Sequence, residues 1–217
     1  RTSRNPAKNK TAKILCNIFR FDRLFSTVSN ILLGLRNIFE KEPKKEVTTD
    51  IQEVKKFDER IDKLWSSTNR QFGIIVERNQ TFLNWRYAKG TMLDYKKFIA
   101  VRDGKVKGYI VLRKEEPGER NFGIIADLYA SRDDQKTVDD LLRHAIHFFG
   151  KDVAAIECAT SVKEYQQAIS KFGFLKLEST VPMYYCENQS VAAELDSLKT
   201  KSFFSKGDHD WDQYTLF

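Results

Sequence analysis

The junction between a predicted strand and a predicted helix, within residues 121–150, carries the charged groups that phosphate binding would involve. A helix N-terminus favours an anion, because its free backbone N–H groups and the positive end of the helix dipole both face it. Residues 131–137 hold Arg132 and Lys136 but no glycine, the residue that would let the chain approach a phosphate closely. A like-charge pair at about 4 Å costs about 1 kcal/mol in water. Phosphate binding is expected to be weakened by four aspartates, which are Asp133, Asp134, Asp139 and Asp140.

A second group with chemical potential is the triplet Trp85, Arg86 and Tyr87. An arginine between two aromatic rings could bind a carboxylate or stack on a sugar. The same rings, together with Phe82, could instead fasten their helix to the sheet. The sequence leaves both alternatives open.

The histidines and cysteines do not predict a metal site. His144 and His147 lie three residues apart on a predicted helix, but no neighbouring cysteine or carboxylate completes a tetrahedral set. Residues 207–212, Gly-Asp-His-Asp-Trp-Asp, lack the length of a calcium loop and are predicted to form a charged turn. The odd number of cysteines, without metal-type spacing, favours reduced thiols in a cytoplasmic protein. These cysteines are Cys16, Cys158 and Cys186.

The net charge of +7 is confined to the first part of the chain. Through Glu46 there are 11 Lys or Arg against 4 Asp or Glu, whereas the other 171 residues hold 26 of each. A nucleic-acid-binding fold more often spreads its basic residues over a folded face, so nucleic acid is not an expected partner. The start of the chain is broken by charges and does not predict a signal peptide, and no segment approaches the ~20 apolar residues of a membrane span.

We expect two parts: a basic amphipathic helical segment and linker over residues 1–45, and a folded domain over residues 46–217. Apolar residues recur with a helical period between residues 14 and 39. This stripe could pack on the domain or on a preceding domain of the same protein. It could also lie on an anionic membrane surface, with Arg20 and Arg23 at the interface.

The pattern of the folded domain alternates between helical and strand periods. Asp103-Gly104 supplies the tight turn of a hairpin over residues 95–115. Ser161 and Glu164 predict a capping box at the start of a later helix. This order is typical of an α+β fold, or α/β sandwich, with a mixed, mostly antiparallel central sheet flanked by helices. The expected elements are helices over 57–71, 79–90, 131–149 and 161–172, and strands over 95–102, 105–115, 122–130, 152–160, 174–186 and within 202–217.

The chain resembles the GCN5-related N-acetyltransferase superfamily over residues 50–217. The resemblance rests on the element order and on a helix that ends in Gly173-Phe174 before an extended strand. Residues 57–65, 82–87 and 206–212 are similar to stretches of a bacterial two-domain acetyltransferase-like group, in which this chain would be the second half. The resemblance implies an acetyltransferase-like fold that uses acetyl-coenzyme A or another acyl-coenzyme A.

The resemblance also implies where the cofactor would bind. In this superfamily the backbone of the strand ending at Leu128, Tyr129 and Ala130 pairs with the pantetheine. A glycine-containing loop then wraps the pyrophosphate at the start of the next helix. The matching residues in this chain are Arg132, Gln135, Lys136 and Thr137. Gln135 and Thr137 stand where the glycines would be.

The implied reaction needs a base to deprotonate the amine and an acid to protonate the departing thiolate. Asp127 and Glu157 each lie in an otherwise apolar strand, where burial would raise the pKa of a carboxyl towards that of a useful base. Strand alternation alone does not decide whether they point inwards or outwards. The superfamily's thiolate-protonating tyrosine would fall at Ile169. Substitutes could be Tyr165, Tyr184 or Tyr185, of which Tyr185 is our candidate.

We therefore expect an acyl-coenzyme A-dependent N-acyltransferase that acts on a small-molecule or envelope-precursor amine, such as an amino sugar. Trp85, Arg86 and Tyr87 would line the groove for this acceptor. The alternative is a non-catalytic domain that serves as the interaction half of a longer protein. The missing glycines and the aspartates favour the alternative, and the element order and Asp127 favour the enzyme.

Overall fold

The computed structural model describes residues 49–88, 93–115, 121–176, 191, 193–194, 198 and 201–208. They belong to one compact unit, Val47–Phe217. The segment predicted over residues 1–45, Tyr184, Tyr185, and the last part of the predicted charged turn lie outside these residues. Among the helices that the structure describes, none is long and apolar enough to cross a membrane.

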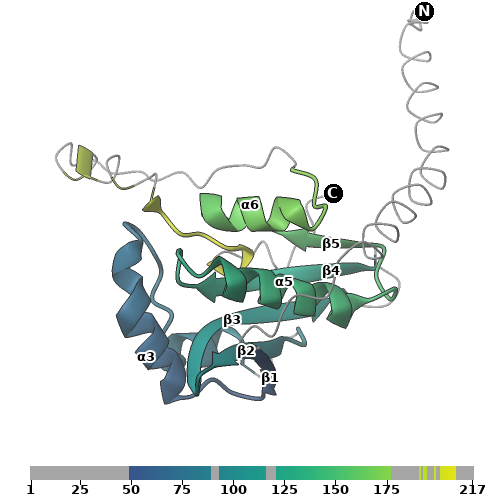
Figure 1. Ribbon diagram of the computed structural model, residues 1–217, viewed down its shortest axis with the longest axis horizontal. Coiled ribbons are helices and arrows are strands. Elements are labelled where there is room, and N and C mark those ends of the chain that lie inside the picture. The colour runs from purple at the N-terminus through teal and green to yellow at the C-terminus, as the bar shows by residue number, and fades with distance from the viewer. Residues whose placement is uncertain are drawn as a thin grey trace, which may run out of the picture. The chain divides into compact units, whose positions relative to one another are not determined.

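A single mixed sheet forms the centre of the domain (Figure 1). Its five strands lie in the order β1-β2-β3-β4-β5, each antiparallel to the next except that β4 and β5 are parallel. The predicted α+β fold class is thereby confirmed. The elements are β1 (Asp50–Val54), α3 (Glu59–Thr68), the 3₁₀ turn η1 (Asn69–Gln71), α4 (Gln80–Arg86), β2 (Lys96–Arg102), β3 (Lys105–Lys114), β4 (Phe122–Ala130), α5 (Gln135–Phe149), β5 (Ala155–Cys158), α6 (Lys163–Lys171) and the 3₁₀ turn η3 (Lys206–Asp208).

The hairpin between β2 and β3 turns as its sequence predicts. Asp103 and Gly104 have φ values of 53° and 69°, the left-handed conformation that a tight primed turn requires at both positions. Strand β1 was not predicted, because its residues follow a charged run and include Asp50 and Glu53. It pairs with β2 as an edge strand, where charged side chains are tolerated.

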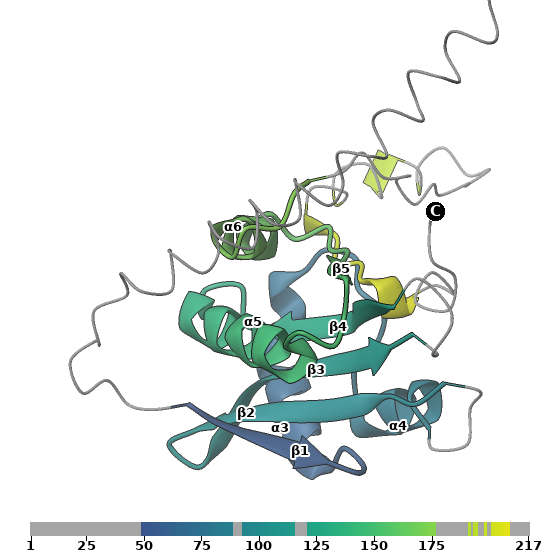
Figure 2. The ribbon, with the colours of Figure 1, turned by 90° about the vertical axis from the view of Figure 1, so that its right-hand side faces the viewer.

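Different helices cover the two faces of the sheet. Gly108 of β3 faces α5, where a Cβ atom would lie 2.8 Å from Cγ2 of Thr137. Tyr109 faces the other way and packs edge-on against Phe57, just before α3, with ring centroids 5.2 Å apart. Successive side chains of a strand point to opposite faces, so α3 and α5 cover opposite sides of the sheet. Figure 2 shows the sheet between these two helices.

The predicted capping box of α6 is wrong. The helix follows Val162, and no side chain caps its first turn. Ser161 instead holds the later part of the chain: its hydroxyl donates to the carbonyl of Ser202 at 2.6 Å and accepts from the N–H of Phe204 at 2.8 Å. Glu164 forms an ion pair with Arg132 in the loop before α5, so neither partner is left for a cap.

The predicted late strands are shorter than expected within the described part of the chain. Residues 174–176 are not in a strand, and residues 177–186 lie outside the description. The segment Ser202–Asp208, which we call the late segment, makes single bridges, Ile75 with Phe203 and Thr160 with Ser205. The first bridge brings the late segment beside the chain that joins α3 to α4, and the second beside the chain that joins β5 to α6.

Candidate functional site

A bulge in β4 decides the direction of Asp127. Ile125 and Asp127 pair with consecutive residues of β3, so Ala126 has no partner across the ladder. The extra residue inverts the alternation, and Asp127 faces the α3 side of the sheet together with Tyr109. Asp127 is buried there, with 2% exposure, and does not point to solvent.

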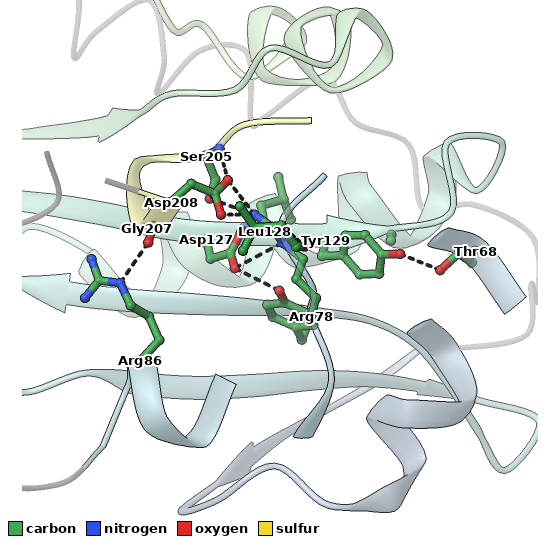
Figure 3. Close-up of polar contacts among 12 residues, drawn as sticks. Thr68, Arg78, Arg86, Asp127, Leu128, Tyr129, Ser205, Gly207 and Asp208 are labelled. Carbon is green, nitrogen blue, oxygen red and sulfur yellow. Dashed lines mark hydrogen bonds and ion pairs between the residues drawn. The ribbon is translucent and has the colours of Figure 1, made fainter. Parts of the chain in front are cut away.

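Arg78 lies between two carboxylates in this buried region (Figure 3). Its Nη2 donates to the carboxylate oxygens of Asp208 at 2.7 and 2.6 Å. Its Nε lies 3.6 Å from Oδ2 of Asp127. The guanidinium carbon also lies 4.1 Å from the ring centroid of Phe203. We call Arg78, Asp127 and Asp208 the buried ion cluster.

The hydrogen bonds around Asp127 fix its orientation. The hydroxyl of Tyr109 donates to Oδ2 at 2.8 Å, and the N–H of Leu128 donates to Oδ1 at 3.0 Å. Burial, followed by the charge of Asp127, raises the pKa of Tyr109 well above its usual value, so this phenol stays a donor. The carboxylate is therefore held by one tyrosine, one backbone N–H and the charge of Arg78.

The pKa values of Arg78 and Asp208 reflect the same burial. Burial lowers the pKa of Arg78, but the charges of Asp127 and Asp208 outweigh this and raise it above its usual value. Burial raises the pKa of Asp208, while Arg78 and the N–H of Ser205 favour its carboxylate. Because Arg78 carries a permanent charge at the centre of the cluster, each carboxylate has a cationic partner.

The cluster lies where β4 and β5 separate. Their pairing ends at Ile125 and Cys158. Beyond that point η3 lies beside β4: a Cβ atom at Gly207 would be 3.1 Å from the carbonyl oxygen of Ala126 and 1.9 Å from the hydroxyl of Tyr87. Only glycine fits this approach, so η3 packs directly against Tyr87 and against β4 next to Asp127.

The strand residues predicted to bind the cofactor have protein partners in this structure. Leu128 donates its N–H to Asp127. Tyr129 shares a hydrogen bond of 2.6 Å between its hydroxyl and that of Thr68. Ala130 donates its N–H to the hydroxyl of Tyr165 at 2.9 Å, and that hydroxyl donates to the Ala130 carbonyl at 2.5 Å. Tyr165 thus occupies both backbone groups that a pantetheine amide would use.

The predicted pyrophosphate loop is also internally bonded. Arg132 pairs with Glu164 of α6 at 2.7 Å, and Gln135 donates to the carbonyl of Arg132 at 3.0 Å. Lys136 lies 3.5 Å from Asp140. These contacts are rearrangeable, because Arg132 and Lys136 are partly exposed.

Asp134 occupies the N-terminus of α5. Its carboxylate accepts the N–H of Thr137 at 3.1 Å and the hydroxyl of Thr137 at 2.8 Å. It also accepts from Nη2 of Arg102 at 2.5 Å. Burial raises the pKa of Asp134, but the Thr137 and Arg102 hydrogen bonds outweigh it, and the net pKa is lowered. A carboxylate of the chain itself therefore holds the position that favours an anion.

We expect Asp134→Ala to lower the free energy of unfolding by about 1–2 kcal/mol at pH 7, the usual range for a helix cap. A carboxyl with a lowered folded pKa stabilises above its unfolded pKa, about 3.9, and this stability is lost as pH falls through the folded value. The difference between wild type and variant should therefore shrink below about pH 4 in urea unfolding. Asp133→Ala, at an exposed neighbour, is the control, and an equal effect there would contradict the capping role.

The triplet predicted to bind the acceptor points in three directions. Trp85 is 71% exposed. Arg86 donates from Nε to the carbonyl of Gly207 at 2.8 Å. Tyr87 is buried and packs edge-on against Tyr95 at 5.1 Å. Trp85 is available to a ligand, whereas Arg86 and Tyr87 support η3 and the core.

Glu157 has a different cationic partner from Asp127. It is partly buried on β5 and bonds to Nζ of Lys206, which is buried. The thiol of neighbouring Cys158 is free, and burial raises its pKa to about 12.

Within the residues that the structure describes, no three metal-ligating side chains are grouped together. His144 is half-buried against the ring of Phe98, with ring centroids 4.4 Å apart.

Sequence reasoning missed Arg78 and the role of Asp208. Arg78 lies in a loop without a recognisable motif, and Asp208 lies in the stretch predicted to be a charged turn. They are 130 residues apart, so no local spacing could have paired them. The only signal was a carboxylate next to glycine in the late segment.

No family model matches the chain, and no curated protein matches it. Several solved structures do match, among them acetyltransferases, as the sequence resemblance implies. An aminoglycoside acetyltransferase, meta-AAC0020, from an uncultured soil metagenomic sample is 15% identical, with a TM-score of 0.45 over 64% of this chain and 97% of its own. AAC(6')-Iy, in complex with a coenzyme A bisubstrate analog, is 14% identical, with a TM-score of 0.44 over 65% and 99%.

A third match is a GCN5-related glucosamine N-acetyltransferase region of a fungal multi-domain GH3 β-N-acetylglucosaminidase. It is 13% identical, with a TM-score of 0.43 over 61% of this chain and 18% of the fungal one. Identities this low leave the function to be inferred from the residues of the chain itself.

Proposed function

We propose that the domain is an acyl-coenzyme A-dependent N-acyltransferase acting on a small-molecule amine. The observation that carries the proposal is the carboxylate of Asp127, which a bulge places at the separation of β4 and β5. Bulges often re-aim a side chain beside an active site. Tyr109 and Arg78 hold this carboxylate in one orientation, as a positioned base requires.

In the proposed reaction the amine nitrogen attacks the thioester carbonyl carbon. The nitrogen–carbon bond forms, the carbon–sulfur bond breaks, and the nitrogen's proton passes to Asp127. The coenzyme A thiolate leaves and takes up a proton from solvent water. Positioning of the two reactants supplies much of the rate enhancement in such a direct transfer. For the acceptor to reach Asp127, the late segment must move away from β4.

A non-catalytic role is the second candidate, and two observations favour it. Asp134 caps α5 where a pyrophosphate would lie, and Arg132 pairs with Glu164. Tyr165 takes the backbone groups of Ala130. In this role the buried ion cluster only stabilises the domain, which would serve a partner or a preceding domain.

Calorimetric titration with acetyl-coenzyme A, and separately with coenzyme A, distinguishes the two candidates. We expect binding in the micromolar range that weakens by at least about tenfold in Arg132→Ala/Lys136→Ala. Arg70→Ala/Lys151→Ala removes the same charge at exposed positions and should bind as wild type does. Absence of binding up to millimolar ligand would overturn the acyltransferase proposal and favour the non-catalytic domain.

A further inference from the structure

A pocket of about 850 Å³ lies at the end of the sheet where α3, the β2–β3 turn and the start of α5 meet. The volume is within the range of small-molecule sites. Leu64 and Val106, both buried, give the pocket an apolar surface. Its charged lining residues are Arg60, Lys63, Arg102, Lys105, Lys107, Asp133 and Asp134.

The basic groups of this pocket are only partly neutralised. Arg60 is held by Asp58 at 2.8 Å, outside the pocket lining, and Arg102 by Asp134 at 2.5 Å. The other cations are lysines for which the described part of the chain provides no ion pair. They are Lys63, Lys105 and Lys107.

Two further groups set the charge balance. Nη1 of Arg102 is buried without a hydrogen-bond partner among the residues described, although Nη2 of the same side chain is paired. Asp133 is exposed and, among the described residues, is the one carboxylate of the lining without an ion pair. Among the described residues, the lining thus has three lysines and a single carboxylate without an ion pair. The pocket attracts an anion.

The pocket shares Ser131, Asp133 and Asp134 with the loop of the predicted cofactor groove but lies on the opposite side of that loop from Arg132. The β2–β3 turn lies on the β3 side of β4, whereas the separation of β4 and β5 lies on the other side. Arg132 reaches towards Glu164 of α6, and Arg102 bonds to Asp134 across the start of α5. Arg102 and Arg132 therefore form their ion pairs on opposite sides of the loop before α5.

We infer that this pocket binds a small phosphorylated molecule with an apolar portion. The lysine ammonium groups would hold the phosphate, because a phosphate accepts charge-assisted hydrogen bonds from ammonium donors. The apolar portion would lie on Leu64 and Val106. This inference does not depend on the acyltransferase proposal, because it uses none of Asp127, Arg132 and Lys136, on which that proposal and its test rest.

Inorganic pyrophosphate is the first probe, titrated calorimetrically into the whole chain. We expect Lys63→Ala/Lys105→Ala/Lys107→Ala to weaken pyrophosphate binding by at least about tenfold. The matched control is Lys55→Ala/Lys151→Ala/Lys171→Ala, which removes three exposed lysines elsewhere and should leave the affinity within about twofold. Circular dichroism verifies that both variants are folded.

Three results would overturn the inference. Pyrophosphate could fail to bind wild type, or bind equally weakly to both lysine variants, which would show general attraction to net charge. It could also lose affinity in Arg132→Ala/Lys136→Ala and keep it in the pocket variant, which would place the anion in the predicted cofactor loop. Retained pyrophosphate binding with no coenzyme A binding would support the pocket and reject the acyltransferase.

Discussion

Replacing Arg78 by methionine is expected to lower the free energy of unfolding by about 3–5 kcal/mol at pH 7, the cost of removing one partner from a buried ion cluster. The Arg78 side chain is completely buried. Without it, the carboxylates of Asp127 and Asp208 would lie close together in the core with no cation. Desolvation would then cost each carboxylate more free energy than its remaining hydrogen bonds contribute.

Urea unfolding followed by circular dichroism measures this loss. Arg70→Met is the matched control, since Arg70 is exposed and its replacement should change stability by less than about 0.5 kcal/mol. Arg78→Met/Asp127→Asn/Asp208→Asn removes all three charges and should recover a large part of the loss. A loss below about 1 kcal/mol for Arg78→Met would show that the ion cluster does not hold the core together.

Phe203→Ala is expected to cost about 3–5 kcal/mol, the range for truncating a fully buried phenylalanine. Its ring is buried and packs on Phe72, Tyr129 and Tyr165, with centroids 5.1, 5.6 and 6.0 Å apart. The guanidinium group of Arg78 also lies over the face of the Phe203 ring. The truncation therefore removes both apolar contacts and the support of the ion cluster.

The location of this effect can be measured as well as its size. Hydrogen exchange should accelerate most within the late segment, because Phe203 anchors that segment to the sheet. Leu175→Ala is the control, because Leu175 is 85% exposed and its truncation should leave both stability and exchange unchanged. Uniform acceleration across β2 and β3 without a larger change in the late segment would contradict the anchoring role.

The sequence predicted the elements whose signals are local. Asp103-Gly104 identifies the hairpin turn, and the apolar periods identify α3, α5 and β4. The edge strand β1 was not predicted, because its charged residues interrupt the strand pattern of apolar residues. The capping box of Ser161 and Glu164 failed because tertiary partners took both side chains.

The candidate site was less predictable for two physical reasons. A single bulge at Ala126 inverts the side on which Asp127 lies, and nothing in the strand's composition predicts a bulge. Arg78 joins Asp127 and Asp208 only after the sheet has formed. Asp134 was predicted to compete with a phosphate at α5, and the structure shows its carboxylate in that position.

The distance along the chain between Arg78 and Asp208 also affects the order of events at the ribosome. The two residues are separated by 130 positions. At about 5–20 residues per second, Asp208 is synthesised roughly 6 to 26 seconds after Arg78. Late in that interval β1 to β5 have been made but Phe203 has not, so Phe72 and Tyr129 still lack its ring. The nascent domain therefore exposes an aromatic surface that a chaperone could bind until its late segment arrives.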